Sequence, residues 1–320
     1  MSMNANLTEI VGKKTYLEYV CSKRFTGGID HHLIFLSTFV VFLSMFTSLG
    51  NALILVALRK ESTLGSPSKL LLRSLATSDF CVGILSDPLY AINLASEINE
   101  DWRVCYYAFS LTALIYSALC TVSLLTTCAI SVDRLLALSL GIRYRETVTL
   151  KRVYGIVITF WILAIAVSAV YLKSPKIATR FIQTVFFSCL SASVFSHTMI
   201  FFNLRQHRTR VQDRRSLEDP PIACSSLRSE VNIAKHKKAV SSVLWVQLAL
   251  LTCYLPYSVI VTLPNIRGEL SQTLVLSQQY AAVFVLVNSS LNPLLYCWKI
   301  LEVRQAVVAT LKKWHCSSTD

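Results

Sequence analysis

Long apolar stretches separated by short polar segments dominate the chain, and seven of them reach or nearly reach the length of a membrane span. A helix rises about 1.5 Å per residue, so each stretch can cross a hydrocarbon core of about 30 Å. The pattern therefore predicts an all-α membrane protein, a seven-transmembrane helix bundle. The expected spans are residues 33–58, 70–95, 105–132, 153–172, 181–204, 239–263 and 274–298.

The segment after the seventh span predicts a short amphipathic eighth helix. Residues 300–314 place Leu301, Val307, Val308 and Leu311 on one face, as in a helix that lies on the inner leaflet. We therefore expect three parts, which are an extracellular N-terminal segment at 1–32, the bundle at 33–298, and the amphipathic helix with the cytoplasmic tail at 299–320.

The charge of the chain is low in amount and uneven in distribution. Charged residues make up 15% of the 320 residues, whereas soluble domains carry about 25%. With the N-terminus outside, the inner segments hold most of the 31 lysines and arginines, which sets the orientation by the positive-inside rule. This topology and anionic lipid head groups account for the net charge, so we expect membrane lipids rather than nucleic acid as partners. The expected location is the plasma membrane, with an extracellular N-terminus.

Two of the ten cysteines, Cys21 and Cys105, face the oxidising side in this topology. Such a pair usually forms a disulfide, and two free thiols are the alternative. The sequon that begins at Asn6 predicts glycosylation on the outer side. Cys316 follows the amphipathic helix in a setting that suits palmitoylation, with an unmodified tail cysteine as the alternative.

An acidic residue, Asp79, lies in the middle of the second span. A carboxylate there needs partners or a proton, and it marks a candidate functional site. Surrounding oxygen ligands would suit a small hard cation or a proton, and a plain hydrogen-bond network that fixes helix register is the alternative. We expect no cofactor apart from such an ion. The candidate partners at similar depth are Asn51, Ser123, Asn288, Ser289 and Asn292.

Opposite charges and two prolines mark the inner half of the bundle. Asp133 and Arg134 stand together at the inner end of the third span, where they can pair. Pro256 in the sixth span and Pro293 in the seventh each free a backbone carbonyl and loosen the helix. Proline kinks are common in membrane helices, so these prolines alone do not establish a switch.

Six short motifs occur together in a fixed order along the seven spans. They are Gly50-Asn51, Leu75 to Asp79, Asp133-Arg134-Leu135, Trp161, Cys253-Tyr254-Leu255-Pro256 and Asn292 to Tyr296. In these motifs the chain resembles the rhodopsin-like (class A) G-protein-coupled receptors over all seven helices. Within that family it is most similar to the branch of melanocortin, cannabinoid and adenosine receptors. The second outer loop is short and lacks a cysteine, and Cys189 stands where the fifth helix usually has a proline.

The resemblance implies a receptor rather than an enzyme, with a heterotrimeric G protein and an extracellular ligand as partners. It implies that Arg134 is released on activation and that Ile142 inserts into the G protein as an apolar anchor. It assigns a sodium ion to Asp79, held with Ser123, Asn288, Ser289 and Asn292.

The switch residues depart from the family pattern in several places. Tyr254, with Pro256 two residues later, replaces a tryptophan, and His197 replaces a tyrosine, whereas Tyr296 matches the pattern. Family members often pair the arginine with a carboxylate at the inner end of the sixth helix, and here His236 stands at that position. We therefore expect appreciable signalling without ligand. The opposing effect is at His197, because by resemblance the tyrosine that it replaces stabilises the active state, and its loss would cancel the gain.

Two residues in the spans bear on the class of ligand. Tyr116 stands where amine receptors carry an aspartate, so a peptide or a lipid is more expected than an amine. Asp87 is a carboxylate in the outer half of the second span. It either contacts the ligand or pairs with an outer-loop lysine, and the sequence leaves both open.

Other functions for seven helices fit the sequence less well. A transporter or channel would show paired repeats with broken helices or a ladder of intramembrane charges, and neither is visible. A zinc hydrolase needs several metal ligands that face one another, and only His197 is a histidine clearly within a span. A retinal-binding light receptor needs a lysine within residues 274–298, and none occurs there.

Overall fold

The computed structural model describes residues 21, 28–60, 66–215, 245, 248–262, 271–299 and 301–317, and this part of the chain is helical apart from short turns. The labelled elements are α3 (Asp30–Lys60), α4 (Ser66–Cys81), η1 (Val82–Ser86), α5 (Asp87–Ile98), α6 (Trp102–Leu140), η2 (Gly141–Arg143), α7 (Tyr144–Thr147), α8 (Leu150–Lys173), α9 (Pro175–Arg215), α11 (Gln272–Lys299) and α12 (Leu301–Ser317). A further apolar helix runs over Leu248–Thr262.

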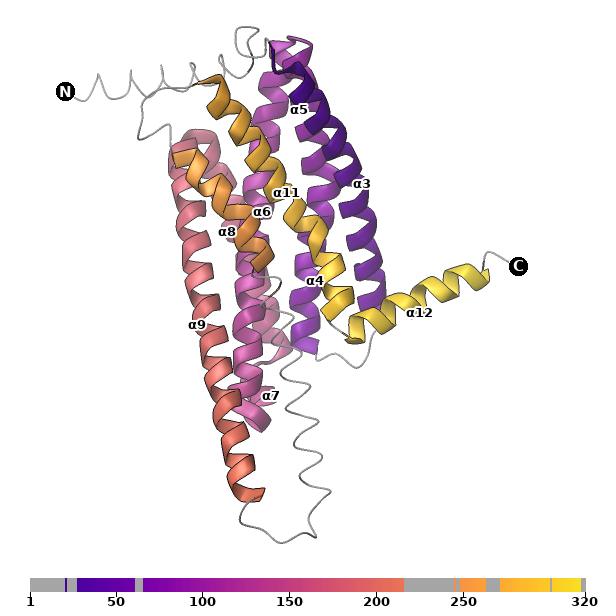
Figure 1. Cartoon of the computed structure of the whole chain (residues 1–320), viewed down its shortest axis with the longest axis vertical. Coiled ribbons are helices and arrows are strands. Elements are labelled where there is room, and N and C mark those ends of the chain that lie inside the picture. The colour runs from indigo at the N-terminus through magenta and orange to yellow at the C-terminus, as the bar shows by residue number, and fades with distance from the viewer. Residues whose placement is uncertain are drawn as a thin grey trace, which may run out of the picture.

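The predicted seven-helix bundle is confirmed. Its long helices run side by side, and α12 leaves the end of α11 at a steep angle (Figure 1). The second span is one continuous rod built from α4, η1 and α5, and the sixth is described over Leu248–Thr262. The helices long and apolar enough to cross a membrane on their own are Asp30–Arg59, Trp102–Leu140, Leu150–Lys173, Pro175–Asn203 and Gln272–Trp298.

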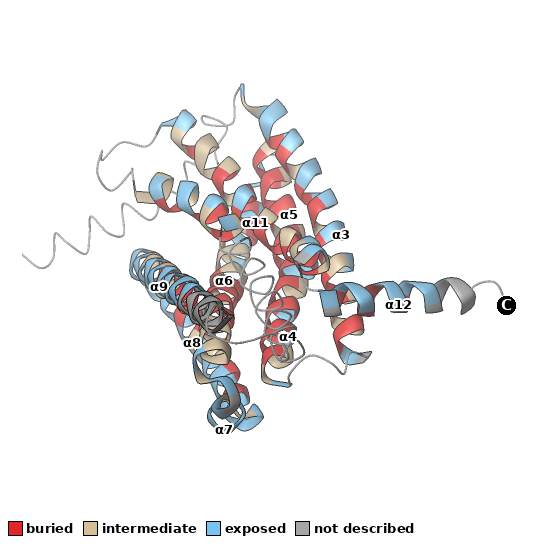
Figure 2. Cartoon of the chain, turned by 60° about the horizontal axis from the view of Figure 1, so that its bottom comes forward, coloured by how far each residue is buried: buried red, intermediate tan, exposed pale blue. Residues whose placement is uncertain are grey.

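Polar residues line the interior of the bundle while large apolar residues cover its outside. On α3, Phe42 and Leu49 are exposed whereas Asn51 is fully buried. Figure 2 shows the same pattern along the helices, with buried positions turned toward neighbouring helices. This arrangement suits lipid as the solvent, because lipid can meet apolar side chains but cannot satisfy polar ones.

The motif residue Gly50 allows a close approach between α3 and α11. A Cβ atom at this position would lie 3.1 Å from Cγ of Pro293. Small residues permit such backbone contacts between membrane helices. Next to it, Nδ2 of Asn51 donates a hydrogen bond of 3.2 Å to the carbonyl of Ser289. The first-helix motif therefore positions the seventh helix.

The second span contains a π-helix, η1, that the sequence pattern did not predict. Gly83 lies against α3, where a Cβ atom would come within 2.6 Å of Oγ of Ser48. Oγ of Ser44 donates a hydrogen bond of 2.7 Å to the carbonyl of Gly83. Contacts with α3 thus accommodate the irregular turn, which is the usual way that a membrane helix tolerates one.

The amphipathic helix α12 is present, but its faces differ from the expectation. Val307 is buried against the bundle together with Val303 and Ala306, in the cluster that includes Ile54 and Leu58 of α3. The other residues expected on that face, which are Leu301, Val308 and Leu311, are exposed. One side of α12 therefore packs on the bundle, and its remaining apolar residues are left for lipid.

Candidate functional site

Asp79 is fully buried and tied to the seventh helix. Nδ2 of Asn292 donates a hydrogen bond of 2.7 Å to Oδ2 of Asp79. The side chain of Ser289 also lies close enough to the carboxyl group to interact with it. The other carboxyl oxygen, Oδ1, has no hydrogen-bond partner in the described part of the chain. Two of the five expected partners therefore meet Asp79 directly.

The remaining expected partners are buried in the same interior but make other contacts or none. Nδ2 of Asn51 donates to the carbonyls of Thr47 and Ser289, at 2.9 and 3.2 Å. The hydroxyl of Ser123, Oδ1 of Asn288 and Oδ1 of Asn51 are buried without a hydrogen-bond partner among the described residues. With Oδ1 of Asp79 they are oxygens of the kind that a small hard cation or water binds.

Asp133 holds three elements together at the inner end of the bundle. Oγ of Ser68 on α4 donates to Oδ2 of Asp133 at 2.7 Å, and the phenol of Tyr144 on α7 donates to Oδ1 at 2.6 Å. Burial, together with the hydrogen bond to this carboxylate, raises the pKa of Tyr144 to about 12. Nη2 of Arg134 is 3.8 Å from Oδ2 of Asp133. The expected local pair is present, but it is the longest of the three contacts.

Sequence reasoning missed both Ser68 and Tyr144. Ser68 is 65 positions from Asp133, and Tyr144 is 11 positions away across a turn. Neither residue type nor spacing marked them as partners of the carboxylate. The contact depends on how α4 and α7 pack against α6, which a one-dimensional pattern does not contain.

The sixth-helix tyrosine lies in an aromatic and sulfur environment. Tyr254 stacks on Phe186 with ring centroids 5.6 Å apart, and its hydroxyl accepts a hydrogen bond of 3.4 Å from Sγ of Cys120. Pro256 is exposed on the same helix. Tyr296 on α11 is buried, and its hydroxyl has no partner in the part of the chain that the structure describes.

The outer end carries a disulfide and a buried glutamate. Cys21 and Cys105 are joined by a disulfide, with their Cα atoms 6.0 Å apart. Glu97 accepts hydrogen bonds from Asn93 at 2.8 Å and from Gln279 at 3.1 and 3.3 Å, which links the second helix to the seventh. Sequence reasoning did not single out Glu97, although the four-residue spacing between Asn93 and Glu97 was a visible signal.

The two pocket candidates from the sequence are both interior. Asp87 is fully buried, and neither carboxyl oxygen has a hydrogen-bond partner among the described residues. The expected alternative, a pair with an outer-loop lysine, is not seen in that part of the chain. The hydroxyl of Tyr116 is likewise buried, and it lies close enough to the side chain of Tyr254 to interact with it.

Three other expected sites lie wholly or partly outside the described residues. Asn6 is outside them. Ile142 is within η2 and Cys316 is within α12, but the description does not extend to their side chains. Glycosylation, the G-protein anchor and palmitoylation therefore stay predictions.

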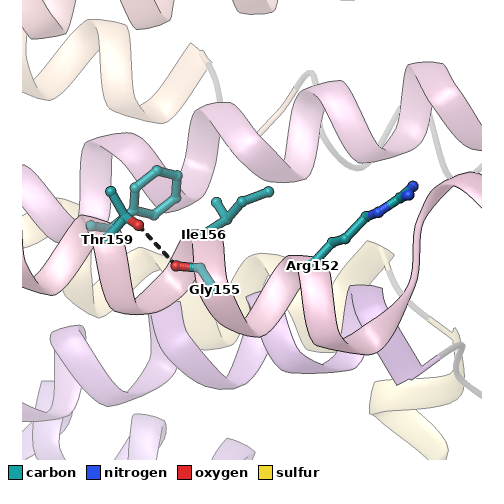
Figure 3. A pocket seen from close by; sticks show the side chains of 5 residues that line it. Arg152, Gly155, Ile156 and Thr159 are labelled. Atoms are coloured by element: carbon teal, nitrogen blue, oxygen red, sulfur yellow. Dashed lines mark hydrogen bonds between the residues drawn. The ribbon is translucent and has the colours of Figure 1, made fainter.

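A shallow depression lies on α8, lined by Arg152, Gly155, Ile156, Thr159 and Phe160 (Figure 3). A Cβ atom at Gly155 would meet no other atom within 4 Å. Oγ1 of Thr159 donates to the carbonyl of Gly155 at 2.9 Å. All five residues belong to one helix, so the depression is a feature of its outer surface and not a cavity between helices.

The chain matches a family model described as 7 transmembrane receptor (rhodopsin family) over residues 50–179 and 172–296. The adenosine receptor A2b of Gallus gallus is 24% identical over 304 residues, which are 85% of this chain and 86% of that protein. The alpha-2B adrenergic receptor of Echinops telfairi is 37% identical over 131 residues, which are 40% of this chain. This chain spans only 32% of the length of that adrenergic receptor in the match. The crystal structure of squid rhodopsin superimposes with a TM-score of 0.75 at 15% identity, over 88% of this chain and 86% of that one.

Proposed function

Because the chain belongs to the rhodopsin family of seven-transmembrane receptors, we propose that it transmits the binding of an extracellular ligand across the plasma membrane as a signal to a heterotrimeric G protein. Membership of this family makes it a G-protein-coupled receptor rather than an enzyme, a transporter or a channel. In this proposal the N-terminus is extracellular. The uneven placement of lysine and arginine supports that orientation.

The inner end of α6 carries the proposal. The two oxygens of Asp133 accept hydrogen bonds from Ser68 and Tyr144, and Arg134 lies further away at 3.8 Å. The guanidinium of Arg134 therefore lies farther from the carboxylate than the two hydroxyl groups do, and it is held less firmly than the carboxylate itself. A modest rearrangement of the inner ends can release Arg134 toward a G protein while Asp133 stays fixed.

The test is agonist-independent nucleotide exchange in membranes that contain the chain and one class of Gα with Gβγ. We expect exchange above that of membranes without the chain for at least one class of Gα. No increase with any class, at verified surface expression, would contradict coupling.

A sodium ion at Asp79 is the second part of the proposal. The support is the set of buried oxygens without partners, on Asp79, Ser123 and Asn288, around a carboxylate that Asn292 holds in place. Oxygen ligands with one negative charge suit a small hard cation. If sodium binds the inactive state more tightly, it opposes activation.

A peptide or a lipid is the proposed ligand class, and the melanocortin, cannabinoid and adenosine branch is the proposed placement. Tyr116 supplies no negative charge for an amine. The match to an adenosine receptor over 304 residues supports the branch. A screen of pooled peptides, lipids, nucleosides and biogenic amines with cyclic AMP and calcium readouts tests both. Activation by a biogenic amine alone would overturn the ligand class.

A further inference from the structure

Asp87 is a buried carboxylate that the contacts described above do not use. Its exposed fraction is 0%. Neither oxygen accepts a hydrogen bond in the described part of the chain, and the ion pair found there joins Asp133 and Arg134 instead. An ionised carboxylate without a partner inside a membrane protein is costly, so such residues mark functional sites.

The π-helix η1 sets the direction in which Asp87 points. The backbone N–H of Asp87 donates to the carbonyl of Val82, five positions earlier, which ends the π turn at Asp87 itself. Asp87 is eight positions after Asp79, so an uninterrupted α-helix would place them about 80° apart. One extra residue in a π turn reduces that offset to about 20°. The bulge thus brings both carboxylates onto one face, about 11 Å apart along the axis.

Several contacts show that this alignment is built into the fold. Gly83 fits closely against Ser48, and its carbonyl accepts from Ser44, so α3 supports the irregular turn. The hydroxyl of Ser86, next to Asp87, is also fully buried without a partner among the described residues. The two carboxylates are close enough to interact electrostatically. Two carboxylates on one buried face are stabilised either by a bound proton or by a bound cation.

We propose that Asp87 is a second cation site, which binds a sodium ion on the route from the outer mouth of the bundle to Asp79. The inference rests on the proposed sodium site at Asp79 and deepens it. The carboxylate of Asp87 and the hydroxyl of Ser86 are hard oxygen ligands of the kind that sodium takes. Because Asp87 has no exposed surface, a bare ion can reach it with less displacement of the helices than the ammonium group of a large ligand.

The first test is the sodium dependence of thermal unfolding of the purified full chain, without agonist, with choline chloride holding the ionic strength constant. We expect Asp87→Asn to raise the half-maximal sodium concentration about tenfold, from the loss of one charge at about 11 Å in a medium of effective dielectric constant about 20. Asp30→Asn, an exposed outer carboxylate on α3, is the matched control and should leave the curve unchanged. If Asp87→Asn has the same half-maximal sodium concentration as the wild type, the inference is overturned.

The second test measures occupancy of Asp87 directly, and its wild-type arm does not depend on how a variant folds. A hydrophobic carbodiimide adds to protonated carboxyl groups in apolar surroundings, and a bound cation prevents the addition. We expect sodium, but not choline, to slow labelling of the Asp87 peptide in the wild type and in Asp79→Asn. If sodium does not change the rate at which Asp87 is labelled, the proposal of a second site is overturned. Labelling of Asp79 that ignores sodium overturns the proposed Asp79 site instead, so the two failures are distinct.

Discussion

The indole rings of Trp245 and Trp298 pack against each other, with centroids 5.6 Å apart and planes inclined at 52°. Trp298 lies in the last turn of α11, and Trp245 lies just before the described part of the sixth helix. The pair therefore joins the inner ends of the sixth and seventh helices. At the position where related receptors carry a carboxylate that pairs with the arginine, this chain has His236, which cannot pair with Arg134 in that way. His236 lies outside the described residues. The aromatic contact restrains the inner end of the sixth helix through the seventh helix, whereas the missing pair would have restrained it through the third.

Replacing Trp298 should raise signalling without ligand. Aromatic pairs contribute about 0.5–1.5 kcal/mol beyond their buried area, so Trp298→Ala should raise basal nucleotide exchange about two- to tenfold. Trp298→Phe keeps a ring and should raise it less. The measurement is basal exchange at matched surface density. Equal rates in the wild type and Trp298→Ala would show that the contact does not restrain the sixth helix.

Tyr144 should contribute to stability through its hydrogen bond to Asp133. Hydrogen bonds to charged groups are worth about 1.5–3 kcal/mol, so Tyr144→Phe should lower the thermal unfolding temperature of the purified protein by several degrees. The control is Tyr154→Phe, an exposed tyrosine on α8. An unfolding temperature as high as that of the control would mean that the contact adds no stability.

Sodium should lower agonist affinity through Asp79. A cation that binds only the inactive state shifts the population by its differential affinity, and Asp79→Asn should remove that shift. Agonist binding is measured in sodium and in a bulky cation at equal ionic strength, once a screen supplies an agonist. A sodium effect of full size in Asp79→Asn would place the ion elsewhere.

The disulfide between Cys21 and Cys105 should be present in the protein from cell membranes. It joins Cys21 to Cys105 at the outer end of α6, where Sγ of Cys105 lies 3.9 Å from Oδ1 of Asn93, a hydrogen-bond partner of Glu97. Mass spectrometry of peptides digested without reduction should recover the two cysteines as one linked species. Recovery of two thiols open to alkylation before reduction would contradict the bridge.

The sequence predicted the helices well because a membrane span leaves a long local signal of apolar residues. It also picked out Asp79 and Asn292, since a polar residue within such a run is conspicuous, and it picked out Arg134 through the motif at the inner end of the third span. It could not predict η1, because that turn depends on how closely Gly83 fits Ser48 on another helix. The same holds for the partners of Glu97, since Gln279 is 182 positions away. Contacts between helices are set by packing, and no local pattern records them.

The central claim is that Arg134 at the inner end of α6 couples the receptor to a G protein. Its most direct test is nucleotide exchange on a co-expressed heterotrimeric G protein, with the wild type compared with Arg134→Ala. The control is Arg73→Ala, an exposed arginine on α4. We predict that Arg134→Ala abolishes exchange while its surface expression stays intact, and that Arg73→Ala retains exchange. Undiminished exchange in Arg134→Ala would contradict the account.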